Sequence, residues 1–196
     1  MSPDSQLNLS HQLQKLRQQR YTANQVSKPR SLQIQSLLQR LTTHLEQDVF
    51  IQQTTDQVRR SLQCDRVVIY YFYYEWKGQV TFESLSQPIY SIYGSTGADD
   101  CFNDDYAQRY LEGRYSYISD LDTAPIHPCH RDFLSSIQVK ASLVMPILPE
   151  RPDHKRLWGL LAAHHCTEPL WWSTSDMETM QAAAQELAQR SSIQNL

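Results

Sequence analysis

The stretch that most constrains this chain is the run 67–74, in which all eight residues are β-branched or aromatic. Such side chains fit a pleated and largely buried surface, so the run predicts the central strand of a sheet. The alternating segment 80–85 predicts the returning strand of a hairpin, with Lys77 and Gly78 as its turn. A chain of 196 residues is long enough for one ordinary domain with its own core but is short for a second full domain.

The order of the remaining elements indicates an α+β fold with an antiparallel sheet. Further strands are predicted at 115–118, 141–148 and 157–165, and Pro146 argues for an edge or a bulge. Helices are predicted, in chain order, over 32–45, 51–62, 106–111 ended by Gly113, 128–137 beginning at Pro128, and 175–193 opened by a capping box at Ser175.

The domain is expected to occupy residues 31–193, with flanking helices at 31–63 and 175–193. Residues 1–30 are polar and rich in Gln and Ser, and Pro29 marks their end, so they are interpreted as an N-terminal extension. The apolar stripe of the leading helices can pair with the same stripe of a second copy, which predicts a homodimer. The apolar stripe of the last helix ends before Ser191 and Ser192. A helix of this kind can continue into a downstream signalling effector.

Charge and hydropathy exclude two classes of partner. A formal net charge of −3 gives no field strong enough to hold nucleic acid or an anionic membrane. The N-terminus lacks the apolar stretch of a signal peptide, and no apolar run approaches the length that spans a bilayer. The chain is therefore expected to be soluble and cytoplasmic.

Four cysteines are spread along the chain, and without an export signal they are expected to be unpaired rather than joined in disulfides. Cys129 precedes His130, and an imidazolium neighbour lowers the pKa of a thiol, so Cys129 is the candidate for covalent attachment. Cys101 lies in the loop 87–105, which is long enough to cover a pocket. Cys64 and Cys166 are expected to be small buried hydrophobes.

Catalysis and metal binding are two other interpretations of the same residues, and the sequence supports them less than covalent attachment. Adjacent Cys129 and His130 make a poor nucleophile–base pair, because a catalytic pair is brought together by the fold with a third orienting group. A zinc site drawn from Cys101, His127, Cys129 and His130 would lack the paired C-x-x-C spacing. We expect neither catalytic nor metal-binding residues, and a sensor module rather than an enzyme.

The chain resembles GAF domains of the bilin-binding cyanobacteriochrome class, relatives of phytochrome, over roughly residues 32–190. The segments that carry the resemblance are 64–70, the Asp-x-Cys-Phe run Asp99-Asp100-Cys101-Phe102, the pair Cys129-His130, 140–143 and 157–165. The resemblance implies a GAF domain with a six-stranded antiparallel sheet, helices on one face and a linear tetrapyrrole in a cleft on the other. Phycocyanobilin or its isomer phycoviolobilin would be the chromophore.

The resemblance also implies roles for particular residues around the first rings. Cys129 would form a thioether to the first ring, and His130 would pack against the bilin plane. Asp99 would accept hydrogen bonds from pyrrole nitrogens or the last ring. Cys101 would add reversibly to the central methine bridge as a second thioether, which divides the conjugation and moves absorption to the violet or blue.

At the last ring the resemblance implies that His164 contacts the carbonyl, that Tyr106 stacks nearby and that Phe102 lines the pocket. Because neighbouring side chains of a strand point to opposite faces, only one of His164 and His165 can face the cleft. The propionates have four candidate partners of equal standing: Arg109, Arg114, Arg131 and Lys140.

The function implied is a photoreceptor that converts between a violet- or blue-absorbing doubly linked state and a teal-, green- or orange-absorbing state. The alternative is a GAF domain without photoactivity that binds a small ligand such as a cyclic nucleotide, or that serves only for dimerisation.

Overall fold

The computed structural model describes residues 34–35, 49–74, 77–97, 104–149 and 157–190. The chain divides into two compact units, 1–41 and 42–196. In the first unit the description covers only Ile34 and Gln35, which are helical and exposed. The rest of the helix predicted over 32–45 lies outside the described residues.

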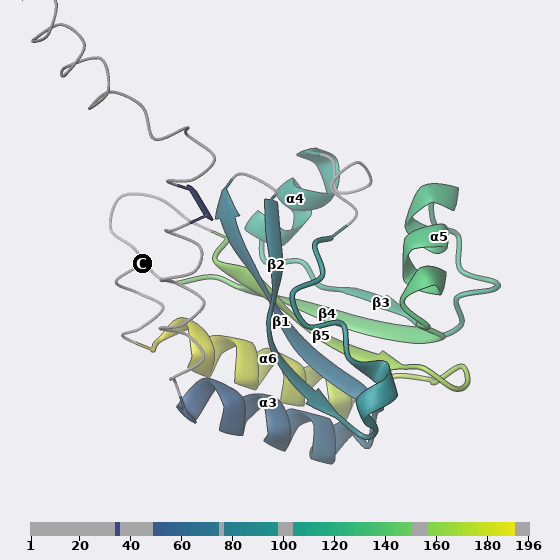
Figure 1. The fold of residues 1–196 in the computed structure, drawn as a ribbon, viewed down its shortest axis with the longest axis horizontal. Coiled ribbons are helices and arrows are strands. Elements are labelled where there is room, and N and C mark those ends of the chain that lie inside the picture. The colour runs from purple at the N-terminus through teal and green to yellow at the C-terminus, as the bar shows by residue number, and fades with distance from the viewer. Residues whose placement is uncertain (1–33, 36–48, 75–76, 98–103, 150–156, 191–196) are drawn as a thin grey trace, which may run out of the picture. The chain divides into compact units, whose positions relative to one another are not determined.

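The described residues of the second unit form an antiparallel sheet of five strands in the order β2-β1-β5-β4-β3 (Figure 1). The strands are β1 (Arg66–Tyr74), β2 (Lys77–Leu85), β3 (Ser116–Ile118), β4 (Ala141–Ile147) and β5 (Gly159–His165). The predicted α+β class is confirmed, and β1 lies between β2 and β5, as expected for a central strand. Six strands were expected, and the described residues contain five.

Helices α3 (Val49–Leu62) and α6 (Thr174–Ala188) pack against each other and against one face of the sheet, where α3 contacts β1 and β2, and α6 contacts β4. In Figure 1 they lie on the opposite side of the sheet from α4 (Asp104–Leu111) and α5 (Pro128–Ser136). The buried core therefore lies between the sheet and the α3–α6 pair. A 3-10 turn, η1 (Pro88–Tyr90), follows β2.

Two helix ends follow the predicted signals. Gly113 has a φ of +83°, and its N–H donates to the carbonyl of Tyr110, so it ends α4 in the left-handed conformation that glycine favours. Pro128 is the first residue of α5. The N-cap of α5 is His127, whose Nδ1 accepts the N–H of Cys129 at 3.2 Å. That imidazole cap was not anticipated.

The turn expected at Lys77 and Gly78 is wrong, because both residues belong to β2 and pair with Tyr74 and Phe72. A β-carbon on Gly78 would overlap the Tyr71 carbonyl oxygen. Glycine is needed there because two strands approach each other closely. A glycine in a turn looks the same in the sequence, which is why a turn was predicted. Pro146 fits the edge expectation locally, since β3 pairs with β4 only from Ser142 to Val144.

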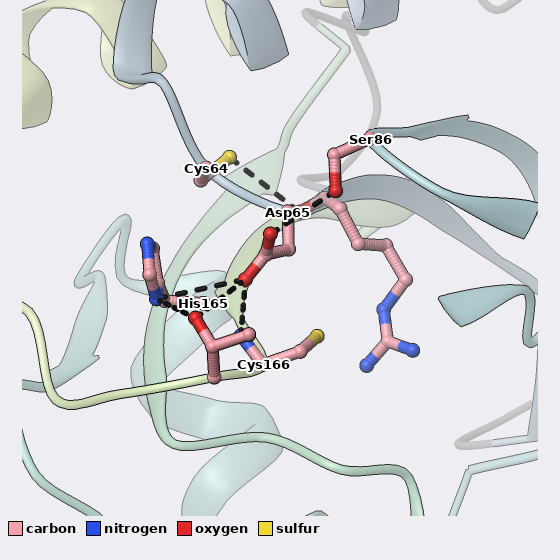
Figure 2. Close-up of polar contacts among 7 residues, drawn as sticks. Cys64, Asp65, Ser86, His165 and Cys166 are labelled. Carbon is pink, nitrogen blue, oxygen red and sulfur yellow. Dashed lines mark hydrogen bonds and ion pairs between the residues drawn. The ribbon is translucent and has the colours of Figure 1, made fainter. Parts of the chain in front are cut away.

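Asp65 links the ends of three strands (Figure 2). Its carboxylate accepts the N–H of Cys166 at 2.8 Å and the hydroxyl of Ser86 at 3.0 Å, and it lies 3.6 Å from Nδ1 of His165. Cys64 and Cys166 flank this cluster as buried free thiols, and burial raises the pKa of Cys64 to about 12. The expected structural role of both cysteines is confirmed.

The capping box predicted at Ser175 is wrong by two residues. Ser173, with extended backbone, is the N-cap of α6: its hydroxyl accepts the N–H of Asp176, and the Asp176 carboxylate accepts the N–H of Ser173 at 2.8 Å. Ser175 lies inside the first helical turn. An acidic residue follows each serine by three positions, Asp176 after Ser173 and Glu178 after Ser175. The local sequence therefore does not show which serine is the N-cap.

We expect Ser173→Ala to lower the free energy of unfolding by about 1 kcal/mol, because it removes an N-cap acceptor. Ser175→Ala is the matched control and should change it by less than about 0.5 kcal/mol, since it exchanges one exposed helical residue for a better helix former. Urea denaturation of the two variants measures both values. Equal losses, or a larger loss at Ser175, would contradict the cap assignment.

Candidate functional site

A cavity of about 970 Å³, a volume that includes solvent at its mouth, lies on the face of the sheet opposite α3 and α6. The sheet contributes alternate residues to its floor: Val68, Tyr70 and Phe72 from β1, Ser142 and Val144 from β4, and Leu160, Ala162 and His164 from β5. This is the period of two that a strand imposes on its side chains.

The other walls come from α5 and from the segment before residue 98. Helix α5 contributes His130, Phe133 and Leu134, and Ile137 at its C-cap joins them. The N–H of Gly97 donates to the Tyr70 hydroxyl at 2.8 Å, which holds that segment against the sheet. The wall is therefore largely aromatic and aliphatic, with a few polar groups among the apolar ones.

His164 faces this cavity, whereas His165 lies beside Asp65 on the other side of the strand. The expectation that only one of the pair faces the cleft is confirmed. His164 is 5 % exposed, and its Nδ1 receives the Nε–H of Arg66 at 3.1 Å. Burial, and secondly the charge of Arg66, hold the pKa of His164 well below its ordinary value, so the ring is neutral at physiological pH.

His130 also lines the cavity, and burial lowers its pKa. Cys129, the preceding residue, is half-buried in the first turn of α5 and is not among the described residues that line the cavity. Its sulfur is in a disulfide, so the expectation of an unpaired thiol is wrong at this position. A disulfide depends on which sulfurs the fold brings within bonding distance, and sequence spacing does not give that distance.

The other predicted site residues are less fully described. Asp99, Cys101 and Phe102 lie outside the described residues. Tyr106 lies in α4, and its side chain is outside the description.

The four basic residues considered for propionates do not line the cavity in the described part of the chain. Arg131 donates to the carbonyls of Leu121 and Ala124. Lys140 lies 3.6 Å from the Asp122 carboxylate, and Arg114 lies 3.3 Å from that of Glu112. Three of the four therefore have acceptors of their own within the protein.

Arg66 is the polar residue that the sequence reasoning missed. It is the first residue of β1 and is 1 % exposed. Because side chains alternate along a strand, Arg66 lies on the same face as Val68, Tyr70 and Phe72, which line the cavity. A charged residue at the start of a buried strand, in phase with a ligand-facing stripe, is the signal that could have found it.

The described residues hold no metal cluster and no membrane-spanning helix that would compete with this cavity. No group of three or more His, Cys, Asp or Glu side chains there could hold a metal ion. A second cleft, between α6 and β4, is lined by residues such as Met145, Gln181 and Gln185 and by none of the predicted site residues. No helix in the same part of the chain is both long and apolar enough to cross a membrane.

Solved structures share this fold, and one of them is bound to phycocyanobilin. The phycocyanobilin-bound GAF domain of a cyanobacterial phytochrome is 30 % identical, with a TM-score of 0.62 over 79 % of this chain and 91 % of that one. The blue-light-absorbing form of the PixJ GAF domain of Thermosynechococcus elongatus is 26 % identical, with a TM-score of 0.62 over 77 % of this chain and 86 % of that one.

The relatives by sequence include cyanobacterial proteins. An uncharacterised protein of Picosynechococcus sp. is 55 % identical over 76 % of this chain and 90 % of its own length. The circadian input-output histidine kinase CikA of Synechocystis sp. is 32 % identical over 67 % of this chain, which spans only 20 % of that kinase. The family model of the GAF domain matches residues 46–190. The chain therefore belongs to the GAF domain family, with strong structural similarity to the GAF domains of cyanobacteriochromes and phytochromes.

Proposed function

We propose that this chain is a photoreceptor sensory module that binds a linear tetrapyrrole covalently. The observation that carries the proposal is the aromatic cavity, whose few polar groups include His130 and His164, with a cysteine adjacent to His130 in α5. A bilin is a long conjugated apolar body with a few polar nitrogens and oxygens, which such a wall accommodates. Similar structures bound to phycocyanobilin, phycoerythrobilin and biliverdin support the ligand class.

Cys129 is the proposed attachment point. Its thiol adds across the exocyclic double bond of the first ring, so that a sulfur–carbon bond forms and the thiol proton moves to the neighbouring carbon. The disulfide must first be opened, and a cellular thiol such as glutathione supplies the two electrons. The neighbouring His130 would then pack against the bilin plane.

Cys101 is the proposed colour switch on phycocyanobilin or phycoviolobilin. Its thiolate adds to the central methine carbon of the protonated bilin, whose cationic π system accepts the displaced electrons, and a neutral, violet- or blue-absorbing adduct results. Light-driven rotation at the last bridge changes the fit, and loss of the thiolate restores the longer conjugation of a teal-, green- or orange-absorbing state. Asp99 would stabilise the cationic form, and Tyr106 and Phe102 would line the pocket.

The proposed output passes through the flanking helices to a second copy and to a signalling effector. The kinase CikA contains a related segment within a longer chain, which supports linkage to an effector. Light would then act by shifting the population of two arrangements of the helical dimer. Light scattering that finds only monomers at high concentration would refute the dimer.

A small-ligand GAF domain remains the alternative, and the cavity wall disfavours an anionic nucleotide. No lysine or arginine lies among the described lining residues, so a buried phosphate would lack a counter-charge. The propionates of a bilin are substituents of its middle rings and can extend to the solvent-facing mouth of the cavity. A protein that remains colourless when produced together with bilin-synthesis enzymes would favour the alternative.

Cys129→Ala, produced with bilin-synthesis enzymes under reducing conditions, should lose covalent pigment to background. The measurement is zinc-enhanced fluorescence of the chain after full denaturation. Cys64→Ala and Cys166→Ala are matched controls and should keep the pigment, because those thiols are buried and lie outside the cavity lining. Denaturation-resistant pigment in Cys129→Ala would reject this attachment site.

Cys101→Ala should keep its covalent pigment and lose the short-wavelength state, because no second thiol can interrupt the conjugation. Absorption spectra before and after blue illumination measure this directly. A Cys101→Ala protein that still absorbs violet or blue light in the dark would refute the second linkage and leave the first intact.

A further inference from the structure

We propose that Arg66 is a positioning residue that holds His164 as the neutral tautomer with its proton on Nε2, so that the cavity presents a hydrogen-bond donor to a neutral carbonyl oxygen. The ligand named here rests on the proposed function, whereas the tautomer belongs to the protein alone and can be measured without any ligand.

The guanidinium of Arg66 is held at three points. Its Nε–H donates to Nδ1 of His164 at 3.1 Å, one Nη donates to the Tyr90 carbonyl at 2.7 Å, and the other donates to the Ile137 carbonyl at 2.9 Å. These acceptors come from β5, from η1 and from the C-cap of α5. Because Arg66 is only 1 % exposed and its guanidinium is planar, the guanidinium has little freedom to turn away from the imidazole.

The direction of the Arg66–His164 bond determines the tautomer. Arginine has donors only and stays protonated in proteins, so Nδ1 of His164 must accept with its lone pair. A neutral imidazole carries one ring proton, which is then on Nε2. Protonation of Nδ1 would replace an attractive hydrogen bond with two N–H groups facing each other beside a buried cation.

The strand register fixes the two side chains as neighbours. Arg66 of β1 is directly opposite His164 of β5, and both are buried. Since His164 lines the cavity and its Nδ1 is engaged by Arg66, Nε2–H is the remaining polar group of the ring. A ligand there meets a donor that cannot become an acceptor by exchanging tautomers.

This arrangement selects the kind of ligand atom that His164 recognises. A lactam carbonyl at the end of a linear tetrapyrrole is a neutral acceptor and matches Nε2–H, whereas a pyrrole N–H is a donor and does not. A carboxylate would gain more from an imidazolium, which Arg66 and burial disfavour. The site is thus matched to a terminal lactam carbonyl rather than to a propionate.

Several other titratable groups lie near the pair in the described part of the chain. His130 and the phenols of Tyr70, Tyr110 and Tyr117 share the cavity wall. Cys166, Glu83 and Asp65 act electrostatically on Arg66. Burial lowers the pKa of Arg66, but a guanidinium stays protonated at neutral pH. Among the described residues, Arg66 is the charged group that acts on His164.

The first test is nitrogen-15 NMR of the imidazole rings in the bilin-free protein, titrated from pH 8 to pH 5, with His164→Gln to assign the resonances. We expect one pyridine-like Nδ1 and one protonated Nε2 throughout that range. A proton on Nδ1, or an imidazolium already formed at pH 6, would overturn the inference. This measurement needs no variant of Arg66 and no pigment.

Arg66→Gln supplies the second test, because an amide can donate to Nδ1 or accept from it and so enforces neither tautomer. The two ring-nitrogen resonances should move toward each other as the tautomers mix. Arg66→Lys, which keeps the charge and has donors only, should restore the wild-type pattern. Arg59→Gln is the matched control: Arg59 donates to Ser84 from α3, on the other face of the sheet, and the His164 signals should not change.

In the pigmented protein, Arg66→Gln should also make the absorption band pH-dependent between pH 8 and pH 5, whereas the wild type and Arg59→Gln stay constant. Unchanged ring signals in folded Arg66→Gln would overturn the positioning role even if pigment binds normally. A wild-type protein that shows the Nε2–H tautomer but binds no bilin would instead refute the proposed ligand and support the tautomer. If Arg66→Gln fails to fold, the wild-type titration decides.

Discussion

The antiparallel register of β1 against β5 is the constraint on which the rest of the structure depends. It places Val67 opposite Ala163 and Arg66 opposite His164, so that successive residues serve opposite faces of one sheet. Val67, Ile69 and Leu161 are fully buried on the helix side, while Val68 and Ala162 line the cavity. A slip of one residue would exchange the two sets and leave neither a core nor a binding wall.

The same alternation gives two adjacent charged residues separate tasks. Asp65 gathers the ends of β2 and β5 through Ser86 and Cys166. Arg66, the next residue, reaches the cavity side and holds His164 together with the carbonyls of Tyr90 and Ile137. Arg66 is buried and Asp65 is partly buried, and because both have hydrogen-bonding partners, neither carries the cost of an unpaired buried ion.

Features set by a residue and its near neighbours in the chain could be predicted. The aromatic run gave β1, Gly113 ended α4, Pro128 began α5, and alternation indicated that only one histidine of the pair would face the cavity. Features set by contacts across the fold could not. Gly78 is needed for the close approach of two strands, and the three partners of Arg66 come from segments far apart in the sequence. The disulfide at Cys129 likewise depends on a contact that the local sequence does not show.

Arg66 also joins two elements of the cavity wall, β5 and α5. The guanidinium that engages His164 on β5 is bonded to the Ile137 carbonyl at the C-cap of α5, the helix that carries Cys129 and His130. Its planar fork bends little, so a displacement of His164 has to be met by a matching movement at Ile137 or Tyr90, or by a broken hydrogen bond in the interior. A ligand that changes shape against His164 would therefore also act on the C-terminal end of α5 through one side chain.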